Sequence, residues 1–343
     1  MSSHVQQGPT SDAVGTHAAM RAIVQDSYGT SDVFHEARIP RPMIADDEVL
    51  LQVAAAGLDR GTWHLMTGRP YLMRVIGFGL RRPKNRVPGL DVAGTVVAVG
   101  SAVTRFALGD KVFGIARGSF AEYAAAREDK LATAPAACTL EEAAVVGISA
   151  LTAYQALTYS GRVEAGQDVL IIGASGGVGS YAVQIAKAFG ATVTAVCSTQ
   201  KLDLVKSLGA DRAIDYTRED FADGTHRYEL IIDIAGNSPL SRLRRALTPH
   251  GTLVIVGGES KGNLTGGFER QLRALLLSPF VGQRLTSTAS KERASDLVLL
   301  AELVESGAVL PSIDRRHPLA EVAEAMRRME AGDIRGKVVI AVS

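Results

Sequence analysis

The chain has 343 residues, of which 46% are hydrophobic and 21% charged, so it is long enough for two domains with substantial cores. Its formal net charge of +1 argues against a dedicated nucleic-acid-binding or membrane-surface protein, because such proteins usually carry an excess of basic residues. Two cysteines, Cys138 and Cys197, are too few for a disulfide framework, so we expect a reducing, cytoplasmic location.

The N-terminal third is expected to be rich in β-strands. Residues 1–19 are rich in Ser, Gly, His and Gln and have no apolar period, which predicts a disordered extension. Between residues 20 and 142, short apolar or alternating runs are separated by Pro and Gly, as in β-structure. No run of about 18 apolar residues occurs in the sequence, so we expect no membrane-spanning segment.

From about residue 143 the pattern changes to strands that alternate with helices. Thr139 and Glu142 have the spacing of a capping box, which predicts a helix start there. Bare apolar strands, such as 168–172, need cover on both faces, and the helices between them can supply it. We therefore predict a doubly wound parallel sheet of the Rossmann type, followed by two amphipathic helices and a closing strand within 294–342.

The stretch GASGGVGS lies between the first strand of this region and the following helix. Ala174, Gly176 and Gly179 occupy the three glycine positions of the dinucleotide-binding fingerprint, with alanine in the first. Such patterns also occur in purely structural turns, but the strand that precedes this one and the helix that follows it favour cofactor binding. A helix starting near Val178 would direct its free N–H groups at the phosphates. The predicted cradle comprises Ala174, Ser175, Gly176, Gly177, Val178 and Gly179.

The end of the next strand bears on the choice of cofactor. Ser198 stands where NAD-binding folds usually carry an Asp or Glu for the ribose 2′-hydroxyl. Without that carboxylate a 2′-phosphate meets no repulsion, and Ser198 and Lys201 supply a donor and a positive charge. We therefore predict NADP(H) rather than NAD(H), with Tyr216 beside the adenosine. The alternative is that Lys201 is a solvated residue that only opens the next helix.

Several longer runs together resemble one family. The sequence is similar to the medium-chain dehydrogenase/reductase superfamily, and within it to the zinc-independent quinone oxidoreductase group. The similarity covers nearly everything from Met20 onward. The runs that carry it are PGLDVAGTVVAVGSAVTRFALGDKVFG, GASGGVGSYAVQIAKAFGA, SLGADRAIDY and RGKVVI.

This resemblance implies an α/β architecture of two domains. Residues 20–142 and 286–343 would form a GroES-like, β-rich catalytic domain, and residues 143–285 a Rossmann NADP(H)-binding domain. The active site would lie in the cleft between them. Cofactor contacts are also implied by position, although each position adjoins a turn or helix where a structural role competes. These positions are Thr152, Gly236, Gly257 and Arg335.

The resemblance also bears on metal binding. Zinc alcohol dehydrogenases of this superfamily carry a Cys where this chain has Asp59, a His where it has Leu90, and a Cys or Asp near Val146. Leu90 and Val146 cannot bind a metal, and a catalytic zinc needs about three protein ligands. We therefore expect no metal site, with Val146 facing the substrate pocket. Asp91 is expected to orient its loop or to pair with a nearby Arg.

The candidate catalytic residues follow the first long strand. The group's Asn-x-x-Asp motif is replaced here by Asp59 and Thr62. Asp59 can act as a general acid only if burial raises its pKa, and is otherwise an acceptor. Thr62 can donate to a substrate oxygen or cap a helix. Tyr71 can relay a proton or only pack against its neighbours. Trp63 can face a quinone ring or belong to the core. These alternatives stay open.

Residues 71–87 form a segment that is longer and more basic than compact quinone reductases need. It walls a bulky apolar pocket if it covers the cleft, and is otherwise an ordinary surface loop. Its apolar residues include Met73, Val75, Ile76, Phe78 and Leu80, and its cations include Arg81, Arg82, Lys84 and Arg86.

These features favour an NADPH-dependent, zinc-free reductase of a quinone or an α,β-unsaturated carbonyl, since hydride transfer without a metal needs an acceptor that is already electron-poor. A zinc-free alcohol or carbonyl dehydrogenase and a non-catalytic NADPH-binding protein are the alternatives. The expected partner is a small-molecule substrate, with no nucleic acid or membrane. The resemblance suggests a homodimer.

Overall fold

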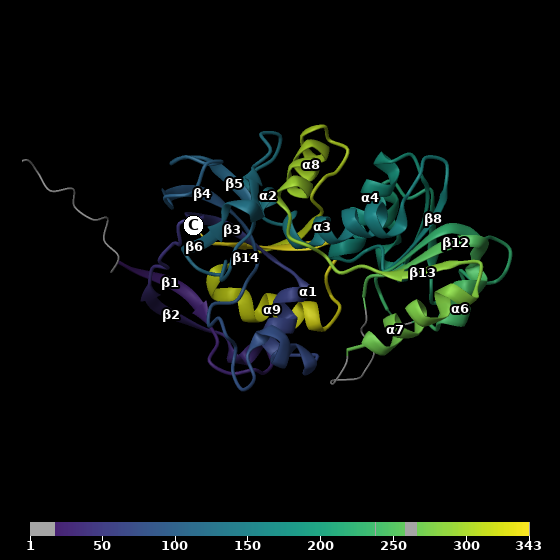
Figure 1. Cartoon of the computed structure of the whole chain (residues 1–343), viewed down its shortest axis with the longest axis horizontal. Coiled ribbons are helices and arrows are strands. Elements are labelled where there is room, and N and C mark those ends of the chain that lie inside the picture. The colour runs from purple at the N-terminus through teal and green to yellow at the C-terminus, as the bar shows by residue number, and fades with distance from the viewer. Residues whose placement is uncertain (1–17, 237, 258–265, 343) are drawn as a thin grey trace, which may run out of the picture.

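The computed structural model describes residues 18–236, 238–257 and 266–342 of the chain. The predicted disordered extension at 1–19 therefore lies almost entirely outside the described residues. Figure 1 shows two regions side by side, one built on an antiparallel-rich sheet and the other on a parallel sheet. The α/β fold class, with a GroES-like N-terminal part and a six-stranded Rossmann-type sheet, is confirmed.

The first region is a sheet of seven strands in the order β14-β15-β3-β4-β5-β7, with β6 paired to β3. Its last strand in the chain, β15, lies antiparallel to β3, so the C-terminus returns to the N-terminal region. Beside it, β1 (Ala19–Val24) and β2 (His35–Pro40) form a separate antiparallel pair. The seven strands are β3 (Glu48–Leu58), β4 (Asp91–Val99), β5 (Lys111–Ile115), β6 (Tyr123–Arg127), β7 (Leu131–Thr133), β14 (Ile313–Pro318) and β15 (Lys337–Ala341).

The second region is a six-stranded sheet in the order β10-β9-β8-β11-β12-β13, and all its strands are parallel. The order reverses between β8 and β11, which is the switch point where doubly wound folds bind their ligands. Strand β13 forms an edge and extends to Ser287, two residues past the predicted domain boundary. The strands are β8 (Asp168–Ile172), β9 (Thr192–Cys197), β10 (Arg212–Asp215), β11 (Tyr228–Asp233), β12 (Leu247–Ile255) and β13 (Arg284–Ser287).

Helices cover the parallel sheet and join the two regions. The predicted capping box is confirmed: Thr139 accepts from the Glu142 N–H, and Glu142 accepts from the Thr139 N–H. The helices are α1 (Arg60–Thr67), α2 (Leu140–Ala143), α3 (Gly147–Gln155), α4 (Gly177–Ala188), α5 (Leu202–Ser207), α6 (Leu240–Ala246), α7 (Phe268–Leu277), α8 (Ala294–Glu305) and α9 (Val322–Glu330).

The core runs through both regions. One buried cluster contains Ala93 and Phe113 of the first sheet together with Ile171 of the second and Val183 of α4. Helix α3 lies between the sheets in Figure 1, and contacts both α4 and α8. Burial on this scale resists separation of the two regions. Among the described helices, none combines the length and the apolar character that a membrane crossing requires.

Candidate active site

The glycine-rich turn lies where the sequence predicts it, between β8 and α4. Gly176 is the N-cap of α4, whose first residue is Gly177, one position before the predicted start. A Cβ on Gly179 would lie 2.6 Å from the Ala174 Cα and would overlap the Gly173 carbonyl oxygen. Glycine at this position therefore permits the close packing of helix on strand that the third fingerprint glycine supplies.

The space above Gly176 suits a phosphate. A Cβ there would meet only the Gly173 carbonyl oxygen at 3.6 Å, so the turn presents bare backbone to an open volume. The first N–H groups of α4 have no acceptor inside the helix and add to its positive end. This geometry fits the pyrophosphate of a dinucleotide, with Ser175 and Val178 on either side of the turn's two central glycines.

The end of β9 brings Ser198 and Lys201 together, but Lys201 already has two protein partners. Its ammonium donates to the carbonyls of Gly332 at 3.0 Å and Ile334 at 2.7 Å, which leaves one of its three protons for a ligand. Lys201 therefore links the parallel region to the loop before β15. Tyr216 is 59% exposed at the end of β10, so its ring is accessible to an adenosine.

A second cation near this strand end was not singled out from the sequence. The Arg218 Nε lies 3.7 Å from Asp215, whose Cα pairs with that of Cys197 across β9 and β10. Hydrogen bonds from the hydroxyls of Thr199 and Thr217 lower the pKa of Asp215, so this buried carboxylate is ionised and already has partners. The spacing of Arg218 from Asp215 was visible in the sequence, but the pairing of β9 with β10 places it.

Three of the four other implied cofactor positions, Thr152, Gly236 and Gly257, have structural roles. The Thr152 hydroxyl donates to the Ile148 carbonyl within α3. Gly236 has a left-handed φ of 72°, and a Cβ on Gly257 would overlap the Ile234 carbonyl oxygen, so both positions demand glycine for backbone reasons. Arg335 is exposed beside Gly336, whose N–H donates to the Ser175 carbonyl at 2.9 Å. The last contact ties the cradle to the start of β15.

A buried ion pair at the end of β11 was also missed. Asp233 is fully buried, accepts from the Gly236 N–H at 3.2 Å and pairs with Arg270 of α7. Arg270 also donates to the Gly236 carbonyl at 2.6 Å. This pair fixes α7 against the carboxyl end of β11. No local sequence motif connects residues 37 positions apart, so only the folded chain reveals it.

Directly after β3, Asp59 is the N-cap of α1. Its carboxylate accepts from the Thr62 N–H at 2.8 Å and lies 3.4 Å from the Thr62 hydroxyl. Thr62 is fully buried and Asp59 is 4% exposed. The structure thus places Thr62 as the partner of a cap, and its hydroxyl does not face solvent; a role as donor to a substrate stays a prediction.

The pKa of Asp59 meets the condition set for a general acid. Burial, followed by the nearby charge of Asp91, raises the pKa of Asp59 to about 7, although Lys337 and Thr62 act in the opposite direction. Burial also raises the pKa of Asp91, opposed by Lys337 and by the Ile148 N–H. Near neutral pH a substantial fraction of Asp59 is therefore protonated, and a protonated carboxyl can donate.

Asp91 pairs with a lysine, where the sequence suggested an arginine or a loop contact. Lys337 of β15 is 1% exposed and its Nζ lies 3.0 Å from Asp91 and 2.9 Å from the Ser149 hydroxyl. The other Asp91 oxygen accepts from the Ile148 N–H at 2.6 Å. Asp91 thus holds β4, β15 and the first turn of α3 together.

This network lies directly beneath the cradle. A Cβ on Gly177 would come within 3.1 Å of the Lys337 side chain and 3.2 Å of the Ser149 hydroxyl. Lys337 lies in the run RGKVVI that contributed to the family resemblance, but no pattern in that run singles it out. Its burial follows from the antiparallel pairing of β15 with β3, in which Val338 lies opposite Leu58.

The remaining predicted pocket residues are mostly enclosed. The Trp63 indole N–H donates to Glu330 at 2.8 Å, and the Arg60 guanidinium lies 4.1 Å from the centre of its ring. This arrangement favours the packing role for Trp63. Val146 is fully buried in the core cluster before α3, whereas Tyr71 is 39% exposed. Roles of Val146 and Tyr71 toward a substrate stay predictions.

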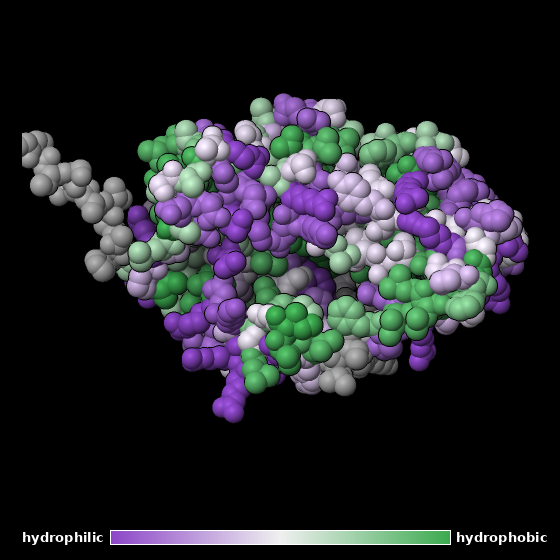
Figure 2. Space-filling view, viewed as in Figure 1, coloured by the Kyte–Doolittle hydropathy of each residue, from purple (hydrophilic) through white to green (hydrophobic). Residues whose placement is uncertain are grey.

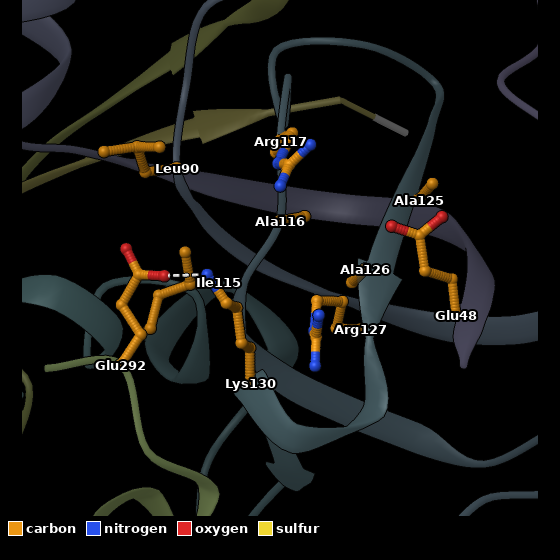
Figure 3. A pocket seen from close by; sticks show the side chains of 10 residues that line it. All are labelled: Glu48, Leu90, Ile115, Ala116, Arg117, Ala125, Ala126, Arg127, Lys130 and Glu292. Carbon is orange, nitrogen blue, oxygen red and sulfur yellow. Dashed lines mark hydrogen bonds and ion pairs between the residues drawn. The ribbon is translucent and has the colours of Figure 1, made fainter. Parts of the chain in front are cut away.

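A small pocket lies elsewhere in the first region (Figure 3). It has a volume of about 150 Å³, and Lys130 and Glu292 form an ion pair at its wall. Leu90 contributes one side of it, while Asp59 and the cradle do not line it. Within the described ranges, no group of three or more His, Cys, Asp or Glu residues is placed to hold a metal ion.

Comparison with known proteins identifies the family. Residues 45–136 match the alcohol dehydrogenase GroES-like domain and residues 208–340 match the zinc-binding dehydrogenase family. A chloroplastic quinone-oxidoreductase homolog from Spinacia oleracea is 33% identical, over 94% of this chain and 98% of that protein. The chain belongs to the medium-chain dehydrogenase/reductase superfamily, in its quinone oxidoreductase-like group.

Two further proteins are similar to this chain over most of its length. A chloroplastic NADPH-dependent alkenal/one oxidoreductase from Arabidopsis thaliana is 34% identical, over 94% of this chain and 79% of its own length. The solved quinone oxidoreductase from Coxiella burnetii is 28% identical with a TM-score of 0.81, over 95% of this chain and all of that one. The protein is thus a quinone oxidoreductase-like member of a superfamily of NAD(P)H-binding oxidoreductases.

Proposed function

We propose that this protein is an NADPH-dependent, metal-free reductase of a quinone or an α,β-unsaturated carbonyl. The observation that carries the proposal is the Lys337–Asp91 pair beneath the cradle. Asp91 adjoins Leu90, the position of a zinc ligand in the superfamily's alcohol dehydrogenases, and here its carboxylate is bonded to an ammonium. The region of the superfamily's zinc ligands thus holds a buried pair whose charges neutralise each other, which suits an acceptor that needs no Lewis acid.

The residues have separable tasks in such a reaction. The α4 N-terminus binds the phosphates, and the open space above Gly176 lets them approach the backbone. When bound, NADPH supplies a hydride, which would add to the electron-poor carbon while the displaced electron pair moves to the carbonyl oxygen. That oxygen then needs a proton, and Asp59, with its pKa of about 7, is a donor of suitable acidity. Tyr71 and water are the other sources.

The names of relatives support the acceptor class. One relative is called a quinone oxidoreductase homolog and another an NADPH-dependent alkenal/one oxidoreductase. The test is stopped-flow oxidation of NADPH by chelator-treated protein with a panel of quinones, enones and simple ketones. We expect turnover with quinones or enones. Turnover of simple ketones alone would favour the carbonyl dehydrogenase, and tight NADPH binding without any turnover would favour a non-catalytic binding protein.

The preference for NADPH rests on the strand end after β9. Ser198, Lys201 and Arg218 offer one hydroxyl and two cations there, and one proton of Lys201 is free of protein partners. Replacing Lys201 by Ala should weaken NADPH binding about tenfold and NADH binding much less, because only NADPH carries the 2′-phosphate. Equal weakening would show that Lys201 acts only through its bonds to Gly332 and Ile334.

We also propose a homodimer in a reducing compartment such as the cytoplasm. Among the strands that the structure describes, none pairs with the outer edge of β13, and the neighbouring segment exposes apolar side chains. Cys138 and Cys197 are both free thiols. Sedimentation velocity tests the dimer, and a monomer at micromolar concentration would contradict it. The exposed apolar residues beside this edge are Phe268, Leu272, Leu275, Leu276 and Phe280.

A further inference from the structure

The segment 69–87, which follows α1, concentrates positive charge. It contains no Asp or Glu, although the whole chain has a net charge of only +1. Charge averaged over the sequence therefore conceals a local excess. The six cations of this segment are Arg69, Arg74, Arg81, Arg82, Lys84 and Arg86.

The same segment presents apolar side chains to solvent. Val75 is 73% exposed, and Ile76 and Leu80 are each 67% exposed, so these residues do not wall an apolar pocket. Tyr71 and Leu72 are exposed beside them. Figure 2 shows hydrophobic residues at the lower edge of the molecule, where the segment after α1 lies in Figure 1, with hydrophilic residues next to them.

Contacts with the body of the protein hold these side chains outward. The Arg74 guanidinium donates to the carbonyls of Gly68 at 2.9 Å and Thr67 at 3.0 Å, and lies over the Tyr28 ring. The Tyr28 hydroxyl donates to the Gly79 carbonyl at 2.6 Å. The charged residue of the turn therefore faces the protein while its neighbour Val75 faces solvent, which reverses the usual preference of a soluble surface.

The cations on the far side of the turn remain available to a partner. Arg86 pairs with Asp26 at 2.6 Å. Of the carboxylates that the structure describes, none lies within ion-pair distance of Arg81, Arg82 or Lys84. Arg82 is near enough to Asp26 to help lower the pKa of that carboxyl, but this carboxylate already pairs with Arg86, so the cations are in excess. An exposed apolar tip with an excess of cations behind it is the pattern of a segment that lies in the interface of an anionic bilayer.

We propose that residues 69–87 dock this protein onto a membrane surface that contains anionic phospholipid. Val75, Ile76 and Leu80 enter the boundary between headgroups and acyl chains, and Arg81, Arg82 and Lys84 contact the phosphates. A second copy of the chain fits less well, because a symmetric contact would bring the same cations against one another. An acidic protein would satisfy the cations but would not need a fixed apolar tip. The inference is independent of the proposed reaction.

The test is co-sedimentation of the full-length protein with vesicles of phosphatidylcholine alone or mixed with phosphatidylglycerol. We expect binding only to the mixed vesicles, weakened by salt. The triple variant V75S/I76S/L80S should bind at least about tenfold more weakly. The triple variant R81Q/R82Q/K84Q should lose about a hundredfold, since each cation near an anionic surface contributes about fivefold.

Matched controls are Met43→Ser and Leu108→Ser, which change apolar residues that are 79% and 66% exposed elsewhere. Both should bind vesicles like the wild type, and thermal melting checks that every variant is folded. A wild-type protein that stays in the supernatant with both vesicle types overturns the proposal, as does an apolar-tip variant that binds unchanged. Sedimentation velocity that shows a dimer lost in V75S/I76S/L80S, without vesicle binding, would assign this surface to a second copy instead.

Discussion

The cradle and the buried network beneath it differ in what they offer a ligand. The cradle at the start of α4 is bare backbone, with glycines that leave an open volume over Gly176. The network consists of the buried ionisable side chains Asp59, Asp91 and Lys337, whose hydrogen bonds are made within the protein. The cradle can bind an external anion, because its N–H donors have no partners in the helix. The buried network contributes stability and sets the acidity of a proton donor.

The largest expected effect comes from breaking the buried pair. Lys337→Met should lower the free energy of unfolding by about 3–5 kcal/mol, because it leaves the Asp91 carboxylate buried without its cation. Urea denaturation measures the loss. The double variant D91N/K337M is the control, since it removes both charges and should recover much of the stability. If the single variant were as stable as the double one, the pair would have no electrostatic role.

A smaller effect should appear in the pH dependence of stability. The folded state raises the pKa of Asp59 from 3.8 to about 7, so it binds a proton more tightly than the unfolded state does. Its contribution is therefore complete at low pH and is lost as the pH rises toward 7 and above. Between about pH 5 and pH 7, wild-type protein should lose about 2 kcal/mol relative to Asp59→Asn, which keeps a competent N-cap.

The same variant tests the proposed proton donor. If Asp59 donates the proton, wild-type turnover should fall above about pH 7, where the carboxyl is ionised, and this fall should be absent from Asp59→Asn. A variant with the wild-type pH profile would assign the proton to Tyr71 or water. The measurement is the pH dependence of kcat/KM with whichever acceptor the panel identifies.

The smallest effects separate the two functions of the glycine turn. Gly179→Ala should lower the free energy of unfolding by about 1–3 kcal/mol, because its Cβ would press on the backbone of Ala174. Gly176→Ala meets no protein atom closer than 3.6 Å and should leave the melting temperature nearly unchanged. It should nevertheless weaken NADPH binding about tenfold, because the methyl group occupies space needed by the phosphates. Unchanged binding in Gly176→Ala would remove the pyrophosphate from this position.

Sequence signals that span a few residues were enough to predict where helices begin. The capping box at Thr139 and the start of α4 could be predicted because their interactions span only a few residues. The composition of segment 71–87, by contrast, allowed either a pocket wall or a surface loop, because it does not show which way the side chains point. Val75 and Ile76 are exposed because the neighbouring Arg74 side chain turns back to the end of α1 and donates to the Gly68 carbonyl. No pattern within the segment predicts this contact.

The sequence alone determined the alternation of strands and helices, the position of the cradle and the superfamily, because each depends on the order of residues over short stretches. The tertiary structure decided that Asp91 pairs with Lys337, that Lys201 already bonds to the loop before β15, and that Asp59 has a raised pKa. These properties arise from burial and from contacts between residues that are far apart in the sequence, such as Asp91 with Lys337. The dielectric environment of a side chain exists only after the chain has folded.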